Sequence, residues 1–156
     1  MSDFEFKIEG LDPVIRKLRA LPEKFGKRGM RRALRKGANV VRNAARNNAK
    51  QIDDPETRER IWKNIAVQGG GARRERQAGG PMMRVGVRGG ARHRDDKALD
   101  SLPGGNTTHW RWVEFGSVNN QARPFMRPAL ANNVDAATNA IVAAAKVELD
   151  KELAKL

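Results

Sequence analysis

A regular apolar stripe in the first third of the chain restricts its fold more than any other feature of the sequence. Apolar and small residues recur there every three or four positions, which is the spacing of one face of an α-helix. The stripe consists of Met30, Leu34, Ala38, Val41, Ala45, Ala49 and Ile52. This spacing predicts a helix from about Glu23 or Arg28 to about Gln51. Because such a helix must bury its apolar face, the rest of the chain has to cover it.

Positive charge occupies the other faces of this predicted helix. The chain has 31 Lys and Arg residues against 18 Asp and Glu residues, a net charge of +13, and most of the excess lies in residues 13–50. A one-sided field of this kind favours a polyanionic partner, either DNA or an acidic protein surface. The alternative is a solvated face that keeps the protein soluble. Some of a set of nine candidate residues are predicted to face DNA or an acidic partner: Arg28, Arg31, Arg32, Arg35, Lys36, Arg73, Arg74, Arg76 and Arg92.

The sequence offers little catalytic or cofactor chemistry. It has no Cys, which excludes disulfides, thiol catalysis and Cys-ligated metals, and it has only two His residues, His93 and His109. No glycine cluster matches a nucleotide-binding fingerprint, and no apolar run approaches the roughly 20 residues of a membrane span. The acidic, alternating N-terminus is unlike a signal peptide. We therefore expect no enzyme activity, cofactor, metal, membrane contact or small-molecule substrate, with a small hydrolase using one of the two His residues as a rival.

The remaining segments predict further helices and strands. Alternation of apolar and polar residues predicts strands at 4–9 and 82–88, a short apolar run predicts one at 65–67, and strand-favouring residues predict one at 110–115. Apolar stripes at helical spacing, with cap residues before them, predict helices. The predicted strands are 4–9, 65–67, 82–88 and 110–115, and the further predicted helices are 13–21, 55–62 and 128–156. Segments rich in glycine and arginine, at about 69–81 and 89–108, are predicted to be long loops.

Together these elements predict an α+β fold that forms one domain over residues 1–156. Its mainly antiparallel sheet of about four strands would be packed by a basic N-terminal helical pair and by a long C-terminal helix. That last helix is long for the domain, so its end is expected to project towards another subunit.

Two runs in the last third of the chain resemble a signature of phage proteins. Residues 112–117 read WVEFGS and residues 122–130 read ARPFMRPAL. They resemble the VEFGT and ARPFLRPAL segments of a bacteriophage tail-component family that was first defined in a lambdoid phage. The ALRKGA run at 33–38 and the leading Gly10-Leu11 also resemble this family, so the resemblance spans nearly the whole chain. The stretch 54–61 departs from the family pattern.

The residues of the two runs predict a rigid corner rather than an active site. Prolines restrict the backbone, a glycine permits a turn that a side chain would block, Phe125 would plug the core, and Arg123 and Arg127 could both reach Glu114 or a partner subunit. Trp110 and Trp112 are expected to share one sheet face. The alternative is that these residues serve only the fold of the monomer. The predicted hinge or subunit-interface residues are Trp112, Glu114, Phe115, Gly116, Arg123, Pro124, Phe125, Arg127 and Pro128.

The resemblance implies a structural protein of the virion, made in the host cytoplasm and located at the head–tail junction. It implies a ring, expected to be a hexamer, that completes or joins the tail around the path of the DNA. The implied partners are copies of the chain itself, adjacent neck and tail proteins, and genomic DNA in the channel. The alternative function is a free, basic nucleic-acid-binding protein.

Overall fold

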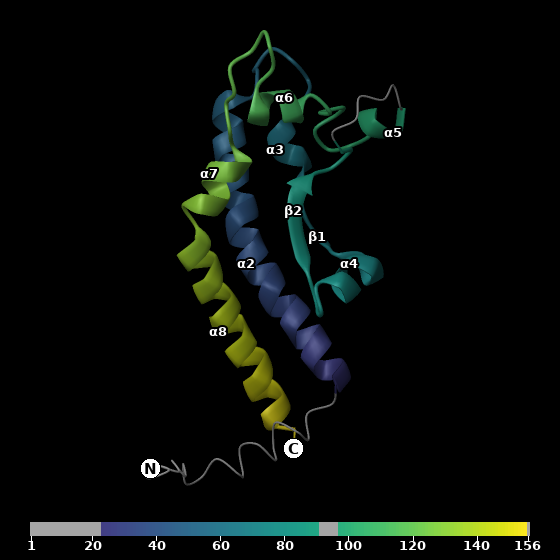
Figure 1. The fold of residues 1–156 in the computed structure, drawn as a ribbon, viewed down its shortest axis with the longest axis vertical. Coiled ribbons are helices and arrows are strands. Elements are labelled where there is room, and N and C mark those ends of the chain that lie inside the picture. Colours follow the sequence, from purple (N-terminus) through teal and green to yellow (C-terminus); the bar gives the residue numbers. More distant parts are fainter. Residues whose placement is uncertain (1–22, 91–96, 156) are drawn as a thin grey trace, which may run out of the picture.

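Two long helices, side by side, form the body of the molecule (Figure 1). The computed structural model describes residues 23–90 and 97–155. Helix α2 (Glu23–Ile52) agrees with the predicted basic helix, and α8 (Val134–Leu153) runs alongside it in the opposite direction. The helices approach closely because α2 has Gly37 at the crossing, where the backbone meets Ile141 of α8. The predicted strand 4–9 and helix 13–21 lie outside the described residues.

The predicted C-terminal helix is present, but it is divided into two. Helix α7 (Met126–Ala131) ends before Asn132, and α8 begins after Asn133. The Asn133 side chain donates to the carbonyl oxygen of Ala129 at 2.9 Å. Asparagine competes for backbone bonds in this way and therefore favours helix ends over helix interiors. Because α8 lies along α2, the described part of this helix does not project from the body of the molecule.

The prediction of a sheet of about four strands is wrong for the described residues. They contain one antiparallel pair, β1 (Ile65–Gly69) and β2 (Met83–Val87), with Val67 opposite Val85. The connection between the strands, predicted as a loop at 69–81, contains helix α4 (Gly71–Gln77). The second predicted loop, 89–108, contains the short helix α5 (Lys97–Asp100).

The predicted strand 110–115 is also wrong, because these residues form helix α6 (Trp110–Phe115). Trp110 and Val113 pack against the core and Glu114 is buried, whereas Trp112 and Phe115 are exposed. Positions i, i+3 and i+4 share a face in a helix, while a strand would have placed the two Trp residues together. The indole Nε1 of Trp110 donates to the Gly90 carbonyl at 2.8 Å.

The predicted helix 55–62 is replaced by a turn followed by the four-residue helix α3 (Ile61–Asn64). The backbone N–H of Glu56 donates to the Asp54 carboxylate at 2.9 Å, which closes a turn instead of starting a helix. The Asp53 carboxylate accepts from the N–H groups of Ile61 and Trp62 at 3.1 and 3.2 Å, so it caps α3 across the turn.

The core sits where α2, α3, β1 and α7 meet. Its fully buried side chains are mostly small or branched, and Phe125 is the largest of them. The Asn64 side chain beside this core is also buried, and it bonds Thr107 and the backbone of Gly104 and Gly105 at 2.7–2.8 Å. The cluster consists of Ala45, Ala49, Ile61, Ile65, Phe125 and Ala129.

Candidate assembly site

The corner between α6 and α7 is built on one buried carboxylate, that of Glu114. Oε2 accepts hydrogen bonds from the backbone N–H groups of Phe125 and Met126 at 2.7 and 2.9 Å, and Oε1 accepts from the N–H of Arg127 at 3.0 Å. These are the first N–H groups of α7, which have no partner within their own helix. Phe125 has no capping side chain of its own, so Glu114 caps α7 from the end of α6.

Arg127 completes the anchor, as the sequence predicts, but Arg123 does not. The Nε of Arg127 lies 3.2 Å from Oε1 of Glu114, and its guanidinium lies 5.1 Å from the centre of the Phe115 ring. For Arg123 the structure records a bond from its backbone N–H to the Val113 carbonyl at 2.7 Å, and none from its exposed side chain to Glu114. The two arginines are therefore not equivalent.

The predicted turn and core plug are confirmed. Gly116 has a φ of 78°, and a Cβ there would lie 3.0 Å from the backbone nitrogen of Ala122, so a side chain does not fit. Phe125 is fully buried. Pro128 lies in the first turn of α7, where its missing N–H costs nothing. The corner is thus held by a glycine turn, a buried ring and a capped helix.

Exposed apolar side chains surround this rigid corner. Trp112 is 50% exposed, Phe115 is 58% exposed and Val118 is fully exposed. Trp112 also lines a cavity of about 430 Å³, together with Ile52, His109, Val113, Asn120, Gln121 and Arg123. Of the predicted interface residues, the structure thus buries Glu114 and Phe125 and leaves Trp112 and Phe115 on the surface.

The pKa of Glu114 is held below its ordinary value. Burial alone raises the pKa of this carboxyl, because it disfavours the charged form. The bonds from Met126, Phe125 and Arg127 outweigh that effect, so the net shift is downward. The anchor is therefore a carboxylate at neutral pH, and it lies at the positive end of the α7 dipole.

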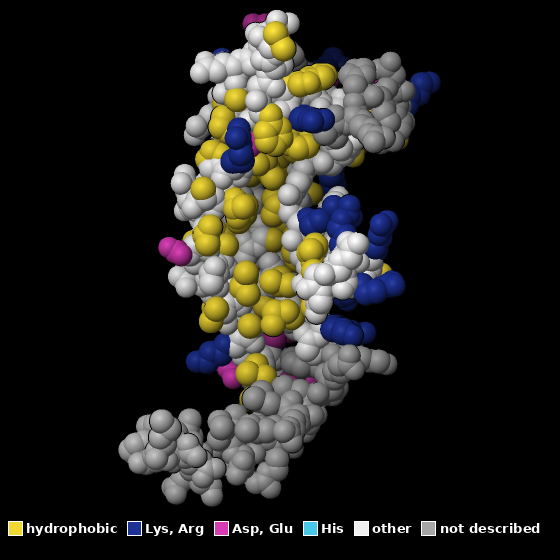
Figure 2. Space-filling view, in the orientation of Figure 1, with side chains coloured by type: hydrophobic (Ala, Val, Ile, Leu, Met, Phe, Trp, Pro, Cys, Tyr) yellow, Lys and Arg dark blue, Asp and Glu magenta, His cyan; other side chains and the backbone are white. Residues whose placement is uncertain are grey.

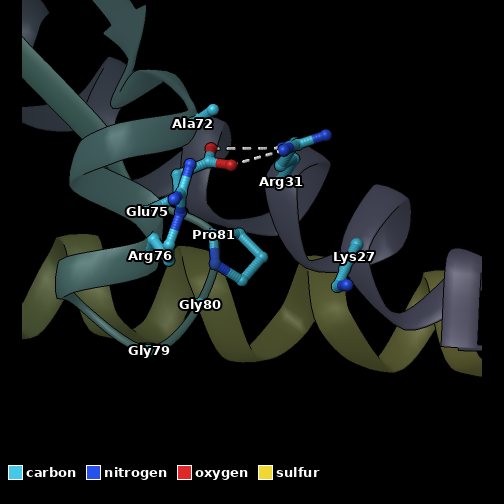
Figure 3. A pocket seen from close by; sticks show the side chains of 8 residues that line it. All are labelled: Lys27, Arg31, Ala72, Glu75, Arg76, Gly79, Gly80 and Pro81. Carbon is cyan, nitrogen blue, oxygen red and sulfur yellow. Dashed lines mark hydrogen bonds and ion pairs between the residues drawn. The ribbon is translucent and has the colours of Figure 1, made fainter.

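Two of the predicted DNA-facing arginines of α2 are paired with acids elsewhere in the chain. Arg31 binds Glu75 of α4, with Nη2 2.5 Å from Oε2 and Nε 3.3 Å from Oε1, and the pair borders a cavity of about 450 Å³ between α2 and α4 (Figure 3). Arg32 binds Glu148 of α8 at 2.9 Å. These bonds lower the pKa of both glutamates. Sequence reasoning missed the acids, because 44 and 116 residues separate them from their partners.

The other predicted cations of α2 and α4 are exposed, and for them the structure records no ion pair among the described residues. Basic side chains gather on the side of the molecule that carries α4 and the hairpin (Figure 2). Arg28 and Arg35 are seven residues apart and therefore share a stripe of α2. Arg92 lies outside the described residues. The exposed set is Arg28, Arg35, Lys36, Arg73, Arg74 and Arg76.

The described residues contain no group of three His, Asp, Glu or Cys side chains that could hold a metal ion. His109 pairs at 3.4 Å with Glu59, and both side chains are well exposed. His93 lies outside the described residues. No helix in the described part of the chain is long and apolar enough to cross a membrane.

A family model covers residues 12–116, from the segment before α2 to the glycine turn after α6, and its description reads "Bacteriophage HK97-gp10, putative tail-component". The chain belongs to the HK97-gp10-like family. As a member of this family, the protein is a structural component of a phage tail and not an enzyme. The run 122–130 that contains Phe125 and Arg127 lies beyond the matched residues. No curated protein and no solved structure matches the chain.

Proposed function

We propose that this tail component forms a ring at the head–tail junction and completes or joins the tail around the path of the DNA. The observation that carries the proposal is the exposed apolar surface formed by Trp112, Phe115 and Val118 around the Glu114 anchor. Aromatic side chains at a rigid, exposed corner are typical of protein interfaces, and preorganisation lowers the entropic cost of association. This surface would contact the neighbouring subunit or an adjacent neck or tail protein.

The α4 side of the molecule is the part that would face DNA or an acidic neighbouring ring. Arg73, Arg74 and Arg76 project from a short helix whose one acid, Glu75, is already paired with Arg31. Contacts of this kind are weak individually and depend steeply on salt, which suits a channel that must release its DNA. They carry no sequence information, so the DNA would be surrounded without being read.

The proposed interface is tested by comparing two double variants. Trp112→Ser with Phe115→Ser removes the exposed aromatics, and Val142→Ser with Val147→Ser removes exposed apolar side chains of α8. Both variants should stay folded by circular dichroism. We expect only the first to be missing from purified particles and to lower the phage titre. Normal incorporation of the first variant, or absence of the wild-type chain from purified virions, would refute the proposal.

The alternative, a free nucleic-acid-binding protein, is distinguished from the ring by how tightly the isolated subunit binds DNA. A free DNA-binding protein requires tight binding of duplex DNA by the isolated subunit, and it need not be incorporated into particles. For the ring, we expect weak binding by the subunit and a normal particle location. Replacing Arg73, Arg74 and Arg76 by Ser should reduce the slope of log K against log salt by about 2.7, if each contacts one phosphate. Replacing the exposed Arg58 and Arg111 should leave that slope unchanged.

A further inference from the structure

Strand β2 has one edge that no other described strand covers. The N–H of Arg88 donates to the carbonyl of Asn64, and the N–H of Gly70 donates to the carbonyl of Met82, both at 2.9 Å. In an antiparallel pair the bonded positions alternate, so the even-numbered residues of β2 bond to β1. The backbone N–H and C=O groups that point away from β1 therefore belong to Met83, Val85 and Val87.

An apolar groove borders this free edge. The groove has a volume of about 450 Å³, its floor is α2, and its walls are β2 on one side and α7 and α8 on the other. No residue of β1 lines it, so it lies on the uncovered side of β2. Figure 2 shows the apolar side chains along this groove. The lining residues are Leu34, Gly37, Ala38, Val41, Met83, Val85, Met126, Arg127, Leu130, Ala137 and Ile141.

The chemistry of the groove suits a row of apolar side chains on an extended backbone. Arg127 supplies the one charged side chain of the lining, and its guanidinium is already bound to Glu114. The lining thus lacks the convergent polar groups that orient a small ligand. The free edge of β2 supplies a row of backbone donors and acceptors at the same place, and natural proteins rarely leave such an edge open.

The sequence contains one segment with the matching pattern, residues 4–9. Phe4, Phe6 and Ile8 alternate with Glu5, Lys7 and Glu9, which is the period of a strand with one buried face. Six residues also match the five-residue length of β2. We propose that residues 4–9, which lie outside the described residues, pair with the free edge of β2 in the same molecule and place their three apolar side chains in the groove.

The covalent connection favours the same molecule over a neighbouring copy. Residues 10–22 join the segment to α2, and they reach at most about 44 Å when extended. With 13–21 helical, as predicted from the sequence, the reach is still about 27 Å. The groove begins near Leu34, about 17 Å along α2 from Glu23. A tether of this length gives the segment an effective concentration at the groove of about a millimolar, which favours binding within one chain over binding to a neighbouring copy.

The tether also sets the direction of the added strand. The N-terminal end of α2 and the Met83 end of β2 lie towards the same end of the molecule (Figure 1). With its apolar side chains on the groove side, the segment would place Ile8 opposite Met83, Phe6 opposite Val85 and Phe4 opposite Val87. The segment then runs antiparallel to β2 and extends the sheet to three strands. Its charged face, with Lys7 near Arg84, points away from α2.

Cross-linking tests the placement directly, since the chain has no Cys of its own. Lys7→Cys with Arg84→Cys places two thiols on the same face of neighbouring strands, and Lys7→Cys with Asn119→Cys is the control pair at the exposed loop after α6. With a short bismaleimide we expect an intramolecular cross-link in monomers for the first pair only. Its absence refutes the placement. A cross-link only between copies, seen when the single-Cys variants are mixed, refutes the same-chain assignment.

Hydrogen exchange gives a second, independent readout. Replacing Phe4, Phe6 and Ile8 by Ser should make the amides of Val85 and Val87 exchange about tenfold faster, because they lose their added partner. The amides of Arg84 and Gly86, which bond to β1, should change little. Replacing Glu5, Lys7 and Glu9 by Ser is the matched control and should leave all four amides protected. If the amides of Val85 and Val87 exchange at the same rate in the apolar-face variant as in the charged-face control, the proposal is overturned.

Discussion

Arg127 bonds Glu114 at two places: its Nε lies 3.2 Å from the carboxylate, and its Nη2 donates to the backbone carbonyl of Glu114 at 2.7 Å. The two partners differ sharply in burial, since the Arg127 side chain is 59% exposed and that of Glu114 is 1% exposed. Solvent weakens the ion pair on the arginine side. The corner is therefore stabilised mainly by the three hydrogen bonds that the buried carboxylate accepts from backbone N–H groups.

Removing the Glu114 carboxylate should destabilise the protein far more than removing its arginine. Glu114→Gln places an amide nitrogen against backbone donors and should lower the free energy of unfolding by about 2–4 kcal/mol. Arg127→Ala should cost about 1 kcal/mol or less. Urea denaturation followed by circular dichroism measures both, with the exposed Glu56→Gln as control. Equal losses for Glu114→Gln and Arg127→Ala would contradict this account.

The same carboxylate should make stability depend on pH in the acidic range. Because the pKa of Glu114 is lower in the folded chain than in the unfolded one, its contribution is complete above the unfolded value of about 4.3. It is lost as the pH falls through the folded value. The urea concentration at the midpoint of unfolding should therefore decrease as the pH is lowered below about 4.3. This decrease should be less steep in Glu114→Gln than in the wild type. Parallel curves for the two proteins would show that Glu114 does not contribute.

Two glycines of α2 should respond in opposite directions to the same substitution. A Cβ on Gly37 would press against Ile141 and lie 2.7 Å from the carbonyl oxygen of Ala137, so α8 must move away. Gly37→Ala should cost about 1–3 kcal/mol. Gly26→Ala meets nothing within 4 Å and should stabilise the helix by up to about 1 kcal/mol. Thermal unfolding measures both, and a neutral Gly37→Ala would mean that the two helices pack more loosely than described.

The Arg31–Glu75 pair should hold α4 against α2 with little effect on global stability. Arg31→Glu should increase hydrogen exchange across α4, and adding Glu75→Arg should restore protection, because the reversed pair can form again. The free energy of unfolding should change little, because solvent screens an ion pair whose arginine is half exposed. Arg35→Glu, at an exposed position without a recorded ion pair, is the control. Unchanged exchange in Arg31→Glu would show that α4 is held by other contacts.

Periodicity was a sound guide wherever a segment was long enough to repeat it. The apolar stripe of α2 located that helix to within a few residues, and alternation located β2, whereas a short apolar run located β1. The strand prediction for residues 110–115 was wrong because two Trp residues and a Phe favour strands locally. Packing of Trp110 and Val113 on the core and burial of Glu114 against α7 overrode that preference.

The candidate site was predictable in part for the same reason. The sequence pointed to Glu114, Gly116, Phe125 and Arg127 through a short motif, and the structure brings all four into one corner. It could not show that Arg31 and Arg32 bind acids on other helices. Nor could it show that only one of the two arginines, Arg127, bonds the Glu114 carboxylate with its side chain.

What the sequence by itself determined is local: the α2 helix, the two strands, the glycine turn and the excess of positive charge. The spacing of apolar side chains predicts the helix and the strands, because each repeats with a fixed period, while the turn and the charge follow from residue type alone. What only the tertiary structure decided is non-local: the helical state of 110–115, the division between α7 and α8, and the carboxylate partner of each arginine. Burial and pairing depend on groups that are distant in sequence, so they are decided only when α2, α6, α7 and α8 pack together.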